Sequence, residues 1–299
     1  MIFFLNICYG HIIFADFISF CRAEVSESSN QSNNVEMLEL PGKKKVRKLY
    51  SIISENWNLA TRIDKKALDK SKEAYEMMAN EEDLMVKREL MEKAREFIQV
   101  KFRTLDVTDH LYELKDFWKV PHGRPLLSSW FEWVTGGSDE GWLEAKMDLN
   151  LEPVLAVVKE IIGNKKGELW VHHYETERLK SEAEYGNLTM LWVFLIREWS
   201  SLYQEKPHRV IYIQEEDSNK ETAANLPFVH VRKIQCPGED FVNRALVSVK
   251  CGTSLLFEDV GLSGALSAVI EIYFVFNLCF DAQVDDSLNF IQRILGGFG

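Results

Sequence analysis

The sequence predicts an α+β, mixed α/β protein. A helical N-terminal half is followed by a small C-terminal sheet that is flanked by helices and ends in a helical hairpin. Three observations predict this class. Apolar residues recur at helical spacing as far as residue 203. Short runs rich in β-branched and aromatic residues follow between residues 209 and 258. Two further helical segments complete the chain, which is the element order of a mixed domain.

The composition is that of an ordinary globular protein with an acidic balance. Hydrophobic residues make up 46% and charged residues 27% of the 299 positions, close to the averages for folded chains. The 35 Lys and Arg face 46 Asp and Glu, which gives a net charge of −11. Because a protein that coats itself in phosphate backbone normally has a basic excess, bulk capture of nucleic acid is disfavoured. Any contact with nucleic acid has to be local.

We divide the chain into an apolar leader with a flexible linker, a helical region with a Trp- and Gly-rich loop, and a mixed α/β domain: residues 1–41, 42–150 and 151–299. The leader ends in Cys21-Arg22-Ala23, which resembles a signal-peptidase site. No Lys or Arg precedes its apolar stretch, and His11 and Asp16 interrupt it. We therefore interpret the leader as a packed segment or stray upstream translation, and a signal peptide is the alternative.

The cysteines favour an intracellular protein, in the nucleus or cytoplasm. No CxxC pair occurs, and the odd number leaves at least one thiol unpaired. Sparse thiols are typical of a reducing compartment, whereas a secreted protein, the alternative, rests only on the leader. The five cysteines are Cys8, Cys21, Cys236, Cys251 and Cys279.

A dense basic cluster opens the second part of the chain. It consists of Lys43, Lys44, Lys45, Arg47 and Lys48. Such a run is typical of a nuclear-import signal or of phosphate contacts, and equally of the solvated start of a helix. We expect any contact with DNA or RNA to use this cluster.

The rest of the second part predicts helices and one long loop. From about Arg62 to Arg103 the chain is charged and nearly free of Gly and Pro, with apolar residues at helical spacing: Leu90, Met91, Ala94, Phe97 and Ile98. This pattern predicts an amphipathic helix, and a second helical stretch runs from Thr108 to Trp118. Residues 121–150 hold several Gly and Pro around three tryptophans, which predicts an irregular loop pinned to the core by Trp130, Trp133 and Trp142.

The third part begins with two amphipathic helices. The first runs from Leu151 to Ile162, with Pro153 in its first turn and Gly163 as its stop. The second runs from Leu188 to Tyr203, with Asn187 placed to cap it.

Four short strands and two helices follow. The strands are predicted at Arg209–Gln214, Phe228–Ile234, Ala245–Lys250 and Ser254–Glu258, and Cys251-Gly252-Thr253 joins the last two as a hairpin. Residues Gly261 to Phe280 form a long apolar helix, and Asp286 to Leu295 form the final one. In the long helix Ser263, Ser267 and Glu271 mark one polar face, which favours a buried helix over a membrane span.

Acidic residues at strand ends are the clearest candidate for chemistry. Glu215 and Asp217 follow the first strand and Glu258 ends the fourth, a placement typical of Mg²⁺-dependent nucleases. Lys250 would be the accompanying lysine, but Ser248-Val249-Lys250 lacks the acid of a Glu-x-Lys motif. A solvated polar turn explains the same acids.

Other catalytic classes have no motif support. His172 and His173 are adjacent, so their side chains point apart in regular structure, and no third zinc ligand lies at a usual spacing. The chain has no GxSxG, GxxxxGK[ST] or GxGxxG motif. We therefore expect no catalytic residue, no metal and no cofactor outside the Mg²⁺ alternative.

The segment Ala265–Arg293 resembles the C-terminal signature of uncharacterised, mobile-element-associated animal proteins labelled similar to sterile-alpha-motif-domain-containing proteins. The matching residues are Tyr273, Val275, Phe276, Asn277, Phe280, Leu288, Phe290 and Gln292. Phe280 stands where the family usually has Tyr, and Ala282 replaces a frequent Pro. The resemblance covers about the last 55 residues and implies a fold unit and an intracellular setting, with no activity to transfer.

These observations favour a non-enzymatic protein that acts by binding a protein partner, derived from a mobile element. The alternatives are a Mg²⁺-dependent nuclease-like enzyme that uses Glu215, Asp217, Glu258 and Lys250, and a secreted protein with a signal peptide. We expect no membrane span in any of these cases.

Overall fold

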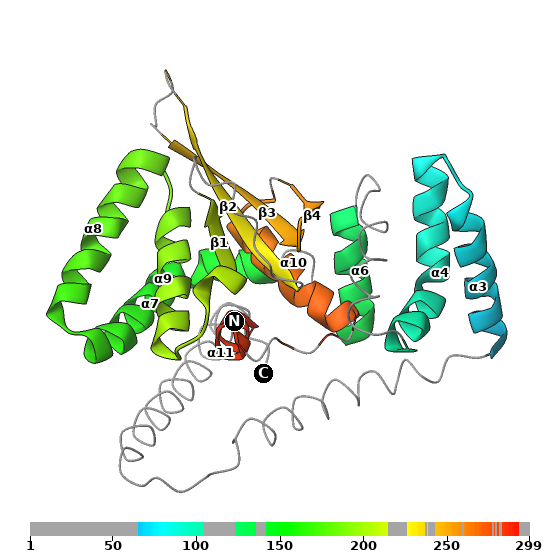
Figure 1. Ribbon diagram of the computed structural model, residues 1–299, viewed down its shortest axis with the longest axis horizontal. Helices are drawn as coiled ribbons and strands as arrows, with labels where there is room; N and C mark the ends of the chain where they lie inside the picture. The colour runs from blue at the N-terminus through cyan, green and yellow to red at the C-terminus, as the bar shows by residue number, and fades with distance from the viewer. Residues whose placement is uncertain are drawn as a thin grey trace, which may run out of the picture. The chain divides into compact units, whose positions relative to one another are not determined.

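The computed structural model describes residues 65–104, 123–135, 142–214, 226–236, 238, 243–258, 260–276, 278, 280 and 283–292. Within these residues helices come first, and a four-stranded sheet with helices around it follows (Figure 1). The predicted fold class is therefore confirmed. The leader, the linker, the basic cluster and the stretch predicted as helical from Thr108 to Trp118 lie outside the described residues.

The single helix predicted up to Arg103 is two helices, α3 (Lys65–Ala79) and α4 (Leu84–Thr104), which pack against one another. The break follows from a cap. Asp83 Oδ1 accepts the backbone N–H groups of Met85 and Val86 at 2.8 and 3.1 Å. This side chain therefore caps the N-terminus of α4, and a new helix begins there. The predicted apolar stripe is confirmed, because Leu90, Met91, Ala94 and Ile98 are buried and Phe97 is half-buried.

The irregular loop predicted over residues 121–150 is wrong wherever the structure describes it. Helix α6 spans Gly123–Thr135, and helix α7 spans Trp142–Lys166. Pro125 lies in the first turn of α6, where a backbone N–H would have no partner within the helix, so its absence breaks no hydrogen bond. Gly123 and Pro125 therefore mark the start of a helix rather than a loop. The predicted core role of the tryptophans is confirmed for Trp130 and Trp142, which are both buried.

Helix α7 also corrects the next prediction. It begins at Trp142 rather than Leu151 and continues past Gly163 to Lys166, so Pro153 lies inside it rather than in its first turn. The sequence did not predict helix α8 (Glu168–Tyr185), which follows after Gly167, a residue with φ of +85°. Helix α9 (Thr189–Leu202) was predicted, but it begins one residue later than expected, so its N-cap position is Leu188 rather than Asn187. Asn187 lies just before this position, and its Oδ1 accepts the N–H of Thr189 at 2.9 Å.

The sheet contains the four predicted strands, β1 (Ile211–Gln214), β2 (Pro227–Gln235), β3 (Asn243–Cys251) and β4 (Ser254–Phe257), in the order β1-β2-β3-β4. β1 is parallel to β2, and the other two pairs are antiparallel. The predicted hairpin between β3 and β4 is confirmed, and Gly252 adopts φ of +59° in its turn, a conformation that favours glycine.

Two helices close the described chain, as predicted, although the first ends at Val275 rather than at Phe280. Helix α10 (Leu262–Val275) packs against β2, β3 and α6 (Figure 1). Most of its side chains are buried. Helix α11 (Asp285–Phe290) packs against α9, where the ring of Phe290 stacks on Trp199 at 4.2 Å between centroids. Among the described residues, no helix combines the length and apolar character that a bilayer crossing requires.

Candidate functional site

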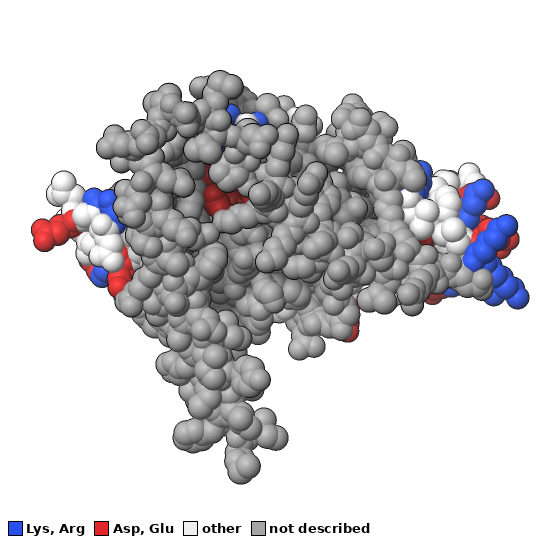
Figure 2. All heavy atoms as spheres, turned by 90° about the horizontal axis from the view of Figure 1, so that it is seen from below, with Lys and Arg blue, Asp and Glu red and all other residues white. Residues whose placement is uncertain are grey.

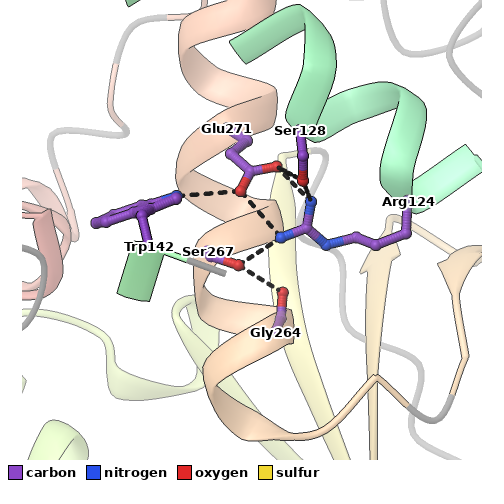
Figure 3. Close-up of polar contacts among 6 residues, drawn as sticks. All are labelled: Arg124, Ser128, Trp142, Gly264, Ser267 and Glu271. Atoms are coloured by element: carbon purple, nitrogen blue, oxygen red, sulfur yellow. Dashed lines mark hydrogen bonds and ion pairs between the residues drawn. The ribbon is translucent and has the colours of Figure 1, made fainter. Parts of the chain in front are cut away.

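A buried ion pair joins α6 to α10 (Figure 3). Glu271 is fully buried on α10, and the guanidinium of Arg124 on α6 binds both of its carboxylate oxygens. One nitrogen of Arg124 also donates to Ser128 Oγ, and the other donates to Ser267 Oγ, both at 2.5 Å. The polar stripe predicted on α10 therefore faces an arginine.

The indole of Trp142 brings α7 to the same carboxylate. Its Nε1 donates to Glu271 Oε1 at 3.1 Å, and Ser128 Oγ donates to Oε2 at 3.3 Å (Figure 3). Burial raises the pKa of Glu271, and the Arg124 charge opposes that rise. Each carboxylate oxygen already has at least two donors, so using it as a catalytic base would require breaking the pair. We interpret this cluster as a structural connection among three helices.

A second polar cluster lies on the sheet around His230. Its Nε2 lies 2.8 Å from Gln214 Oε1, and its Nδ1 lies 3.3 Å from Ser248 Oγ. Burial lowers the pKa of His230 to about 4, with smaller contributions from Lys250 and Arg232. The imidazole is therefore neutral at pH 7, and the Tyr212 ring stacks beside it at 5.9 Å.

Apolar side chains are exposed where α3 meets α4. We name Met77, Leu84, Met85 and Val86 the α3–α4 tip; their exposed fractions are 62%, 46%, 58% and 43%. Met77 is in the last turn of α3 and the other three form the first turn of α4. Figure 2 shows, at the right, the opposite end of these two helices, where Lys and Arg side chains lie beside Asp and Glu.

The residues of the predicted Mg²⁺ site are only partly described. Lys250 is half-buried in β3, and Glu258 is exposed directly after β4. Glu215 and Asp217, like the basic cluster, lie outside the described residues. Where the chain is described, no three His, Cys, Asp or Glu side chains gather closely enough to hold a metal ion. The nuclease interpretation remains a prediction.

The two histidines of α8 do not share a site. Both are exposed, and His173 lies 3.6 Å from Glu177 and packs edge-on against Phe194. Nearby, a shallow depression between α7 and α8 includes Lys159, whose ammonium group is paired with Glu175. Neither feature brings together a nucleophile and a base.

Comparisons with known proteins add no relative: no protein-family model, no curated protein and no solved structure matches this chain.

Proposed function

We propose that the protein acts by binding another protein through the α3–α4 tip, rather than by catalysis. The observation that carries the proposal is the exposure of four neighbouring apolar side chains at one end of a helix pair. The buried stripe of α4 already forms the contact between the two helices. The side chains of the tip lie outside that stripe and remain as exposed apolar surface.

The composition of the tip suits a protein partner. Met77 and Met85 are unbranched and polarisable, so their side chains adapt to an irregular apolar surface. Exposed aliphatic side chains gain free energy when a partner removes them from water, at about 25 cal/mol per Å² of apolar area.

The charges beside the tip indicate what kind of partner fits. Glu76, Glu82 and Asp83 are exposed within a few positions of the apolar residues, although Glu76 also lies 3.8 Å from Lys72 and Asp83 caps α4. Lys87 and Arg88, the cations that follow the tip in the sequence, are half-buried. A partner segment that combines apolar and basic side chains would pair with both features. We therefore propose a basic, amphipathic protein segment as the occupant.

Affinity capture with a matched pair of variants tests the proposal. Full-length wild-type protein, the tip variant Met77→Gln/Met85→Gln, and the control Leu169→Gln/Leu179→Gln are used as baits, each with and without nuclease treatment. The control removes two apolar side chains of α8 that are 89% and 66% exposed. We expect the tip variant, but not the control, to lose a nuclease-resistant partner whose binding weakens as salt rises. Equal capture by the tip variant, or loss of every partner on nuclease treatment, would contradict the proposal.

A further inference from the structure

The four strands contain cations but no acids. Within β1, β2, β3 and β4 the charged residues are Arg232, Lys233, Arg244 and Lys250, and no Asp or Glu occurs. The whole chain, by contrast, has a net charge of −11. The strands themselves therefore contain only positive charges, although the protein is acidic.

Two of these cations share one face with His230. The register pairs His230 with Ser248 and Phe228 with Lys250, while Arg232 lies two positions beyond His230 in β2. Because alternate residues of a strand share a face, Lys250 and Arg232 lie on the His230 side. Along the strand direction they flank His230, about 13 Å apart between backbones, a gap that their long side chains can bridge.

The opposite face of the same strands is apolar. Val229, Val231, Val247 and Val249 occupy the alternate positions and are all buried. An apolar face of this kind packs against an apolar helix, and α10 packs against both β2 and β3. The two cations therefore lie on the face of His230 and Ser248, which we call the polar face. It also contains two apolar residues, Phe228 opposite Lys250 and Leu246 opposite Arg232. On this face Arg232 is exposed and Lys250 is half-buried.

Neither cation has a counter-charge among the described residues. In the part of the chain that the structure describes, the side chains of Arg232 and Lys250 take part in no ion pair or hydrogen bond. Gln214 and Ser248 hold both nitrogens of the neutral His230, so the imidazole supplies no negative partner. Within the described residues, two cations without an acidic partner therefore lie beside a buried, neutral ring, and they create a positive potential that an anion would neutralise.

We propose that Arg232 and Lys250 form a binding site for a phosphate-type oxyanion on the polar face of the sheet. The guanidinium of Arg232 presents paired donors that match two phosphate oxygens, and Lys250 adds a point charge from the neighbouring strand. Tyr212, stacked beside His230, places an aromatic ring on the same face. A free phosphate and the phosphate of a nucleotide strand would make the same contacts, so the experiment has to separate these two sources.

Inorganic phosphate is the first probe. The ring signals of His230 in the full-length protein, assigned with His230→Gln, are followed by NMR as phosphate is added at constant ionic strength. We expect a saturable shift in the wild type and a loss of affinity of about tenfold or more in Arg232→Gln/Lys250→Gln. Lys233→Gln is the matched control, since it removes a cation from the same strand but from the opposite face.

A fluorescent oligothymidylate is the second probe and distinguishes the two sources. Binding that weakens with salt in wild type, and weakens less steeply in the double variant, assigns the phosphate to a nucleic-acid strand. Binding of inorganic phosphate alone assigns it to a small ligand. No saturable shift with either probe, or an equal loss in Lys233→Gln, would overturn the proposal. Tip variants leave both measurements unchanged, so the result is independent of the proposed protein interaction.

Discussion

Glu271 is a charged side chain with no exposed surface, so its neighbours decide whether it stabilises the fold. A buried carboxylate without a cation is costly, and burial alone raises its pKa. Arg124, Ser128 and Trp142 supply donors to both oxygens. The complete cluster therefore lowers the stability of the fold little, whereas removal of one partner lowers it strongly.

Removing the cation should destabilise the protein strongly. Arg124→Ala leaves Glu271 buried and unpaired, and we expect a loss of about 3–5 kcal/mol in the free energy of unfolding measured with urea. Replacing both partners, as in Arg124→Met/Glu271→Leu, should cost less than Arg124→Ala. The control is Lys72→Ala, which removes an exposed pair at 3.8 Å to Glu76 and should cost about 0.5 kcal/mol or less. Equal effects of Arg124→Ala and Lys72→Ala would contradict this role.

At the scale of elements, the start of the short helix α11 is bound by one carboxylate from the segment that follows α9. Glu205 accepts the N–H groups of Asp286 and Ser287 at 2.7 and 3.1 Å, and also the Ser287 hydroxyl. Ser287 Oγ lies 2.5 Å from Ser200 Oγ of α9. Burial raises the pKa of Glu205 to about 7, and its hydrogen bonds oppose the rise without cancelling it.

The raised pKa gives α11 a pH dependence with a defined sign. The folded state favours protonated Glu205, so its contribution is complete below the ordinary pKa of 4.5 and is lost as pH rises through about 7. We expect wild type to lose stability relative to Glu205→Gln between pH of about 5 and 8, measured by urea unfolding of both proteins. A difference between the two proteins that stays constant over this range would contradict the assignment to Glu205.

Local patterns predicted some elements and missed others for physical reasons. The strands, α9 and α10 were predicted because their apolar residues follow one period along the chain. Helix α8 was missed because its buried set mixes aromatic residues with Ser181, while Leu169 and Leu179 are exposed and blur the stripe. At the buried cluster, Ser267 and Glu271 could be predicted as a polar face, but Arg124 lies 147 positions from Glu271. No local pattern contains a pairing of that separation.

At the scale of the whole molecule, the net charge of −11 repels phosphate except where cations gather. The densest gathering in the sequence is Lys43, Lys44, Lys45, Arg47 and Lys48. If the chain binds duplex DNA through this cluster, changing all five to Ala should remove most of the binding. It should also flatten the salt dependence, by about 0.9 units of slope for each phosphate that the variant no longer neutralises.

An equal change of charge elsewhere separates local binding from the overall field. The control variant changes five exposed cations of the α3–α4 pair to Ala, namely Lys65, Lys66, Lys70, Lys72 and Lys93. Both variants have the same net charge, so a field effect would alter their duplex binding equally in a fluorescence titration at several salt concentrations. Local binding instead lowers the slope only in the cluster variant. Binding with an unchanged slope in the cluster variant would show that these five residues are a solvated segment, because cations that release no counterions from DNA do not hold the phosphate backbone.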